Sequence, residues 1–206
     1  MRTVRLFLCA ALLCFATGLS AQFFQGIGVM GGLTWGNQRW SSPTMELATP
    51  KTKRLLRFNG EIFAEFFAHE NLRWVTEAQF NMKGTKTDGF GVTQNYTNNI
   101  IAWNNYLKIR HETYRFIPYV LVGPRLEYTM SSPQSFEQFH VTGSAGAGTE
   151  IVSFGALKFL TEIHYVPDLT RSFSSEPLDI KQKVWELRVG LKWVPNNGDK
   201  CPPVYR

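Results

Sequence analysis

The alternation of side-chain character with a period of two constrains this chain most. It is clearest in residues 72–83 and recurs in residues 185–193. Successive side chains of a β-strand point to opposite faces, whereas the spacing of a helix would mix the two sets. One face of the first segment carries Leu72, Trp74, Thr76, Ala78, Phe80 and Met82, and the other carries Arg73, Val75, Glu77, Gln79, Asn81 and Lys83. Both segments are therefore predicted to be strands.

Six further segments show the same alternation more weakly, which brings the predicted number of strands to about eight. Most approach the ~9–11 residues that a tilted strand needs to cross a bilayer. These six segments are residues 27–35, 58–66, 101–110, 119–128, 140–151 and 157–165.

The predicted connections alternate in length along the chain. Short turns at one rim and long loops at the other are typical of outer-membrane barrels. An even number of strands puts both ends of the barrel on the short-turn side, which we expect to face the periplasm. The long connections are 36–57, 84–97 and 166–180, the short ones 68–71, 111–115 and 152–155, and 131–138 is intermediate.

The first residues are typical of a secretory signal peptide. Arg2 and Arg5 precede an apolar run over residues 6–15, and small residues follow up to Ala21. We therefore predict a signal peptide over residues 1–21, a barrel domain over residues 22–194 and a proline-containing periplasmic tail over residues 195–206. The apolar run is too short to cross a membrane as a helix, which takes about 20 residues.

Charge and cysteine content argue against two other classes of protein. Lysine and arginine number 22 against 16 acidic residues, and the cations are scattered among the acids, which does not indicate a nucleic-acid footprint. Only Cys201 follows the predicted signal peptide, so an internal disulfide in the mature chain is excluded. The fold has to depend on burial and hydrogen bonding.

The polar faces of the predicted strands carry cations and anions in near balance, which suits a closed interior. An eight-stranded barrel has room inside only for its own side chains. The predicted fold is therefore all-β: an eight-stranded antiparallel up-and-down transmembrane β-barrel with a polar, side-chain-filled interior and an apolar face toward outer-membrane lipid. A soluble periplasmic β-barrel ligand carrier or a β-sandwich, with apolar residues inside, is the structural alternative.

Four charged residues near the middle of their predicted strands are expected to form an interior polar network. Burying such charges unpaired would cost several kcal/mol, so they are expected to pair. These residues are Glu77, Arg125, Glu127 and Arg188.

The first long connection is the best candidate for binding. Basic and aromatic residues there could contact anionic surface sugars or a protein, although exposed charges also serve solubility. The candidates are Trp40, Lys51, Lys53, Arg54 and Arg57.

The sequence indicates no catalytic, cofactor-binding or metal-binding motif. The four histidines, at positions 69, 111, 140 and 164, are too widely spaced for a zinc motif. His140, Ser144 and Glu150 contain the groups of a nucleophilic set, but ten residues of one strand span ~33 Å. A set drawn from different strands stays open. We expect a non-catalytic protein, with an outer-membrane lipid-modifying enzyme as the alternative.

Four segments resemble the PorT-like family of small outer-membrane β-barrel proteins. They are residues 26–34, 76–84, 119–126 and 187–193. The resemblance implies a barrel in the outer membrane of a Gram-negative bacterium. The namesake of that family is an accessory component of type IX secretion and gliding. The resemblance therefore implies a role in envelope integrity, assembly or secretion support, with envelope or secretion-machinery proteins as partners.

Overall fold

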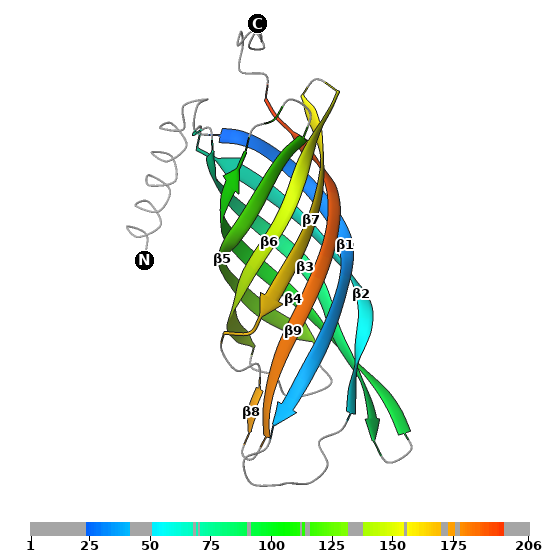
Figure 1. Cartoon of the computed structure of the whole chain (residues 1–206). Coiled ribbons are helices and arrows are strands. Elements are labelled where there is room, and N and C mark those ends of the chain that lie inside the picture. The colour runs from blue at the N-terminus through cyan, green and yellow to red at the C-terminus, as the bar shows by residue number, and fades with distance from the viewer. Residues whose placement is uncertain are drawn as a thin grey trace, which may run out of the picture.

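Eight antiparallel strands close into a barrel in the computed structural model (Figure 1). The structure describes residues 24–41, 51–67, 69, 71–89, 92–111, 113, 116–131, 138–154, 156–169, 173–175 and 178–195. The predicted signal peptide, Cys201 and all but the first residue of the predicted tail lie outside these ranges. The barrel strands are β1 (Phe24–Ser41), β2 (Lys51–Phe66), β3 (Leu72–Gly89), β4 (Val92–Arg110), β5 (Phe116–Ser131), β6 (Phe139–Phe154), β7 (Leu157–Pro167) and β9 (Leu178–Trp193).

Each barrel strand pairs with its neighbour in sequence, and β9 pairs with both β7 and β1 to close the cylinder. The closing seam is long: it runs from the pair Ile27 and Trp193 to the pair Ser41 and Asp179. A short additional strand, β8 (Phe173–Ser175), pairs only with β9. The predicted eight-stranded up-and-down barrel is confirmed. The described residues include no helix of the length and apolarity needed to cross a membrane.

The barrel is apolar outside and polar inside. Large apolar side chains such as Val29, Ile62 and Trp103 expose 56%, 60% and 59% of their surface on the outer wall. The alternating residues on the same strands point inward and are buried, and many of them are charged. A soluble carrier would have the reverse arrangement. The apolar outer band suits contact with lipid. The closed set of strands suits it as well, because every backbone polar group in lipid needs a hydrogen-bond partner within the protein.

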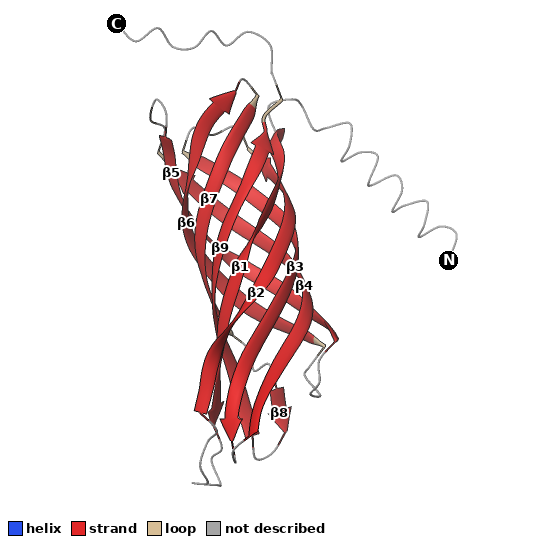
Figure 2. Ribbon diagram, turned by 90° about the vertical axis from the view of Figure 1, so that its right-hand side faces the viewer, coloured by secondary structure: helices blue, strands red, loops and turns tan. Residues whose placement is uncertain are grey.

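The two rims of the barrel differ. We call the rim where β1 begins and β9 ends the terminal rim, and the opposite one the distal rim (Figures 1 and 2). At the terminal rim, consecutive strands follow each other closely, as β2 and β3 do between Phe66 and Leu72. At the distal rim, the β3–β4 hairpin stays paired as far as Gly89 and Val92.

The prediction of long loops over residues 36–57 and 84–97 is wrong. β1 continues to Ser41, β2 already begins at Lys51, and β3 and β4 cover nearly all of 84–97. Apolar alternation marks a strand only where one face meets lipid. Beyond the apolar band the sequence of these strands is mostly polar, so the alternation disappears although the backbone hydrogen bonds of the hairpin continue.

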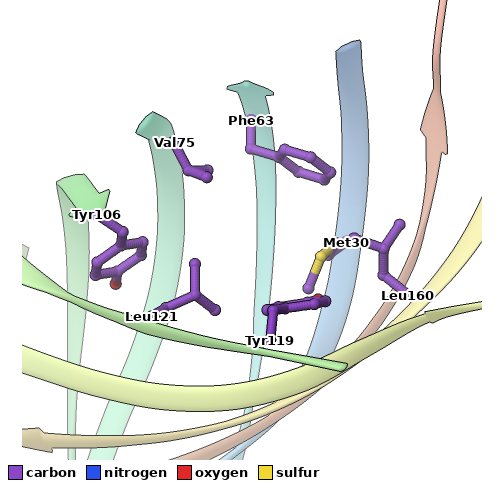
Figure 3. Packing of buried hydrophobic residues seen from close by; sticks show 7 residues of the cluster. All are labelled: Met30, Phe63, Val75, Tyr106, Tyr119, Leu121 and Leu160. Atoms are coloured by element: carbon purple, nitrogen blue, oxygen red, sulfur yellow. The ribbon is translucent and has the colours of Figure 1, made fainter. Parts of the chain in front are cut away.

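A layer of apolar side chains lies inside the barrel, which the prediction of a polar interior did not include. These residues come from six strands and lie near the ends of those strands at the terminal rim. Their side chains point into the interior of the barrel (Figure 3). They are Met30, Phe63, Val75, Tyr106, Tyr119, Leu121 and Leu160.

Inward-facing glycines make room for the large interior side chains. A Cβ at Gly148 would lie 2.8 Å from the hydroxyl oxygen of Tyr119, and one at Gly146 would lie 2.7 Å from the ring of His164. Interiors this closely packed cannot take extra volume without displacing side chains or backbone. The glycines therefore help to determine which large side chains the lumen can hold.

Replacing Gly148 by valine is expected to destabilise the barrel by about 1–3 kcal/mol through overpacking against Tyr119 and the backbone of β7. The measurement is the urea midpoint of unfolding in detergent, read by the mobility shift on gels with and without heating. Ala147→Val is the matched control, because Ala147 is adjacent and exposed on the outer wall. Equal midpoints for the two variants would contradict this account of the lumen.

Candidate functional site

Arg188 on β9 is the centre of the charged network in the lumen. Its Nη1 atom donates hydrogen bonds to Glu61 on β2 at 3.0 Å and to Glu77 on β3 at 3.1 Å. Its Nη2 atom donates to Glu186, two residues earlier on β9, at 2.5 Å. One guanidinium thus joins three strands, and all of these side chains are buried.

Glu186 links this centre to a second group of charges. Its Oε1 atom accepts a hydrogen bond from Arg125 on β5 at 3.0 Å. Arg125 also forms an ion pair with Glu127 at 2.6 Å, and Glu127 accepts a hydrogen bond from Lys83 at 2.6 Å. The structure therefore brings Glu77, Arg125, Glu127 and Arg188 into one connected network.

The network contains members that the mid-strand criterion did not select, chiefly Glu61, Lys83 and Glu186. All three alternate with lipid-facing residues on their strands, so the period of two already placed them inside. The sequence gives no signal for which inward residues meet, because that depends on strand tilt and stagger around the barrel. Glu186 in particular bridges the two arginines.

A separate charged cluster lies toward the terminal rim. Lys108 donates to Glu65 at 2.5 Å and to Glu150 at 2.6 Å. Lys192 donates to the same two carboxylates at 2.9 Å and 2.6 Å. Two lysines and two glutamates therefore satisfy one another where water is excluded, which makes such pairs stabilising only as a complete set.

Three residues form the contacts of a serine–histidine–acid relay. The Oγ atom of Ser144 lies 3.2 Å from Nδ1 of His164, and Nε2 of His164 lies 2.7 Å from Glu162. Glu162 also accepts a hydrogen bond from the hydroxyl of Tyr119 at 2.6 Å. Ser144, His164 and Glu162 expose only 4%, 0% and 5% of their surface. The relay is drawn from two strands, which the sequence analysis had left open.

The other histidine set, His140, Ser144 and Glu150, is not assembled. His140 forms its contact with Glu127 at 2.7 Å, while Glu150 pairs with the lysines of the terminal cluster. His140, Ser144 and Glu150 therefore lie apart along β6, as expected, and each contacts a different partner.

Three buried carboxylates, those of Glu61, Glu77 and Glu162, offer oxygens within 4.8 Å of one another. The guanidinium of Arg188 already lies among them, with Nη1 at 2.9 Å, 3.1 Å and 3.9 Å from the three groups. This arginine supplies positive charge at the centre of the cluster, so the three carboxylates and Arg188 form a buried ion-pair cluster.

The five residues predicted for loop binding lie in strands at the distal rim. Trp40 is in β1 and the other four are in β2. Lys53 and Arg54 are exposed, but Arg57 donates hydrogen bonds from Nε and Nη2 to Thr97 of β4 at 3.1 Å and 2.9 Å. Arg57 therefore links β2 to β4. Of the described side chains of this group, those of Lys53 and Arg54 are the most exposed to solvent. The side chains of Trp40 and Lys51 are not among those that the structure describes.

Comparison with known proteins supports the fold. The chain is similar to the outer membrane protein OprG from Pseudomonas aeruginosa, with a TM-score of 0.59, 10% identity, and coverage of 84% of this chain and 98% of that one. It is also similar to Neisserial surface protein A, with a TM-score of 0.53, 11% identity, and coverage of 81% and 96%. No family model matches the sequence, and no curated protein matches it. The chain therefore has the architecture of an outer-membrane β-barrel.

Replacing Arg125 by leucine is expected to cost about 3–5 kcal/mol, because Glu127 and Glu186 would each lose a buried cationic partner. The measurement is again the urea midpoint of the folded protein in detergent. Arg54→Leu is the control, since Arg54 is an exposed arginine at the distal rim. If Arg125→Leu unfolded at the same urea concentration as the control, the network would not be a stabilising feature of the lumen.

Proposed function

We propose that this protein is a non-catalytic outer-membrane barrel that presents its distal rim to an anionic partner outside the cell. The observation that carries the proposal is that β2 pairs with β3 at Lys53 and Arg54, beyond a register shift that follows the apolar band, and that both cations are exposed there. A hydrogen-bonded extension holds these cations on a rigid frame, which reduces the entropy lost on binding.

In this proposal the terminal rim faces the periplasm and the distal rim faces outward. The close succession of strands at the terminal rim supports this orientation, because outer-membrane barrels have short periplasmic turns. The filled lumen supports a role other than passage of solutes: the axis is occupied by the Arg188 network and by the apolar layer around Tyr119.

The cellular role we propose is support of envelope integrity, assembly or secretion. This part depends on the resemblance to PorT-like proteins in the sequence. Envelope or secretion-machinery proteins and acidic surface polysaccharides are the partners whose chemistry suits a basic, sheet-like rim.

Binding of a soluble polyanion tests the proposed surface. We expect the purified protein in a zwitterionic detergent to bind dextran sulfate and not uncharged dextran, with affinity falling as salt is raised. The double variant Lys53→Gln/Arg54→Gln should weaken binding about 3–10-fold, as expected for two exposed charges. Isothermal titration calorimetry provides the measurement, and binding to intact cells expressing the protein tests the orientation.

Lys158→Gln is the control for the dextran sulfate experiment, because it removes one positive charge far from the distal rim. Lys158 lies at the terminal rim, where it pairs with Glu150 at 3.4 Å. Its loss should leave dextran sulfate binding unchanged. Equal affinities of the wild type and the double variant would refute the rim as the polyanion site, whereas binding by purified protein but not by intact cells would refute the orientation.

A lipid-modifying hydrolase is the second candidate, because Ser144, His164 and Glu162 have the contacts of a nucleophilic relay. Their enclosure argues against it, since a nucleophile has to reach the substrate carbonyl. We expect no release of fatty acid from phospholipid by purified folded protein. Hydrolysis by the wild type that is lost in a folded Ser144→Ala variant would reverse this choice.

A further inference from the structure

β5, β6 and β7 run side by side in the barrel wall (Figure 1). A groove of about 360 Å³ lies on the outer side of these three strands. Its volume is in the range of small-ligand sites. Its lining is mostly apolar and includes Val122, Pro124, Gly143, Ala145, Tyr165 and Leu169. Val122, Pro124 and Ala145 are exposed on the outer wall, so the groove opens toward the membrane and away from the lumen.

Local sequence explains why the wall is hollow at this point. Pro124 pairs with Gly143 across β5 and β6, and glycine leaves no side chain to fill the surface. β7 ends at Pro167, and the chain continues past an isolated bridge between Thr142 and Asp168. Leu169 then lies over Gly143: a Cβ there would be 3.4 Å from Cδ1 of Leu169. The groove thus has a small-residue floor and an apolar overhang.

A cation and two aromatic rings lie beside the groove. Tyr165 lines the groove, and its ring centroid is 5.0 Å from that of Trp185. Such rings are enriched where membrane meets water. Lys183 is exposed, alternates onto the same face as Trp185, and pairs with Pro167. Two residues of strand place it ~7 Å beyond Trp185. Tyr165 pairs with Ala145 and with Trp185, so the aromatic pair lies alongside the groove, whereas Lys183 pairs with Pro167, which lines the distal part of the groove.

We propose that this groove binds an acyl chain of an anionic lipid and that Lys183 binds the phosphate of the same lipid. The apolar groove suits the acyl chain, and Lys183 at its distal end has the charge and the position to contact the phosphate of the same molecule. The site is separate from the proposed polyanion rim, whose cations are on β2. The lipid-site proposal does not depend on which rim of the barrel faces outward, so it can be tested in detergent.

Native mass spectrometry of the folded protein in detergent tests the site with two probes, palmitoyl-oleoyl phosphatidylglycerol and phosphatidylcholine of the same chains. We expect the wild type to retain phosphatidylglycerol at least about threefold more than phosphatidylcholine. Ala145→Trp, which fills the groove, should reduce retention of phosphatidylglycerol at least about threefold. Ala147→Trp is the matched control, because Ala147 is also exposed on β6 but does not line the groove.

Substitutions of Lys183 test the headgroup contact. Lys183→Gln should remove the preference for phosphatidylglycerol, and Lys183→Arg should keep it. Inorganic phosphate at millimolar concentration should not displace the lipid, because the chain contributes to binding. All variants are first checked for the heat-dependent mobility shift of a folded barrel.

Several outcomes would overturn the proposal. These are equal retention of the two lipids by the wild type, equal loss in Ala145→Trp and Ala147→Trp, a preference that persists in Lys183→Gln, or complete displacement by inorganic phosphate. A dimer of the wild type that Ala145→Trp converts to a monomer would assign the groove to a second copy of the chain instead.

Discussion

Closure of the sheet by the pairing of β1 with β9 is the constraint on which the rest of the structure depends. Without that seam, two strands would present unpaired backbone groups to lipid, where each costs several kcal/mol. Closure also separates two environments. Side chains that alternate outward meet lipid, and those that alternate inward meet only one another, so each strand needs one apolar and one self-compensating face.

The inward faces meet this requirement in two ways. Buried charges share their partners, and glycines lie opposite the large side chains. Glu186 serves two arginines, while Lys108 and Lys192 share two glutamates. Charges buried in this way are stabilising as complete groups, because removal of one member leaves its partners without compensation. The inward glycines belong to the same design: a lumen this narrow holds Tyr119 and His164 only because Gly148 and Gly146 lie opposite them.

A lumen filled in this way moves the candidate functions to the surfaces. The distal rim carries exposed cations on strands that stay paired beyond the apolar band, and Arg57 reinforces that extension by bonding to Thr97. The outer wall carries a groove where Pro124, Gly143 and the end of β7 interrupt an otherwise filled surface. The Ser144–His164 contact is buried inside the barrel, apart from both surfaces.

The sequence by itself determined the number of barrel strands and the face of each residue in the alternating segments, because an alternation of two is a local property of the backbone. It therefore placed Arg125 and Arg188 inside and Trp185 outside. Tertiary structure decided which inward residues meet: the bridge by Glu186 and the contact of Ser144 with His164 depend on strand tilt and stagger, which no single strand encodes. It also decided where strands end. Lys53 and Arg54 belong to a strand because β3 pairs with them, and the loss of apolar alternation beyond the lipid band had concealed this from the sequence.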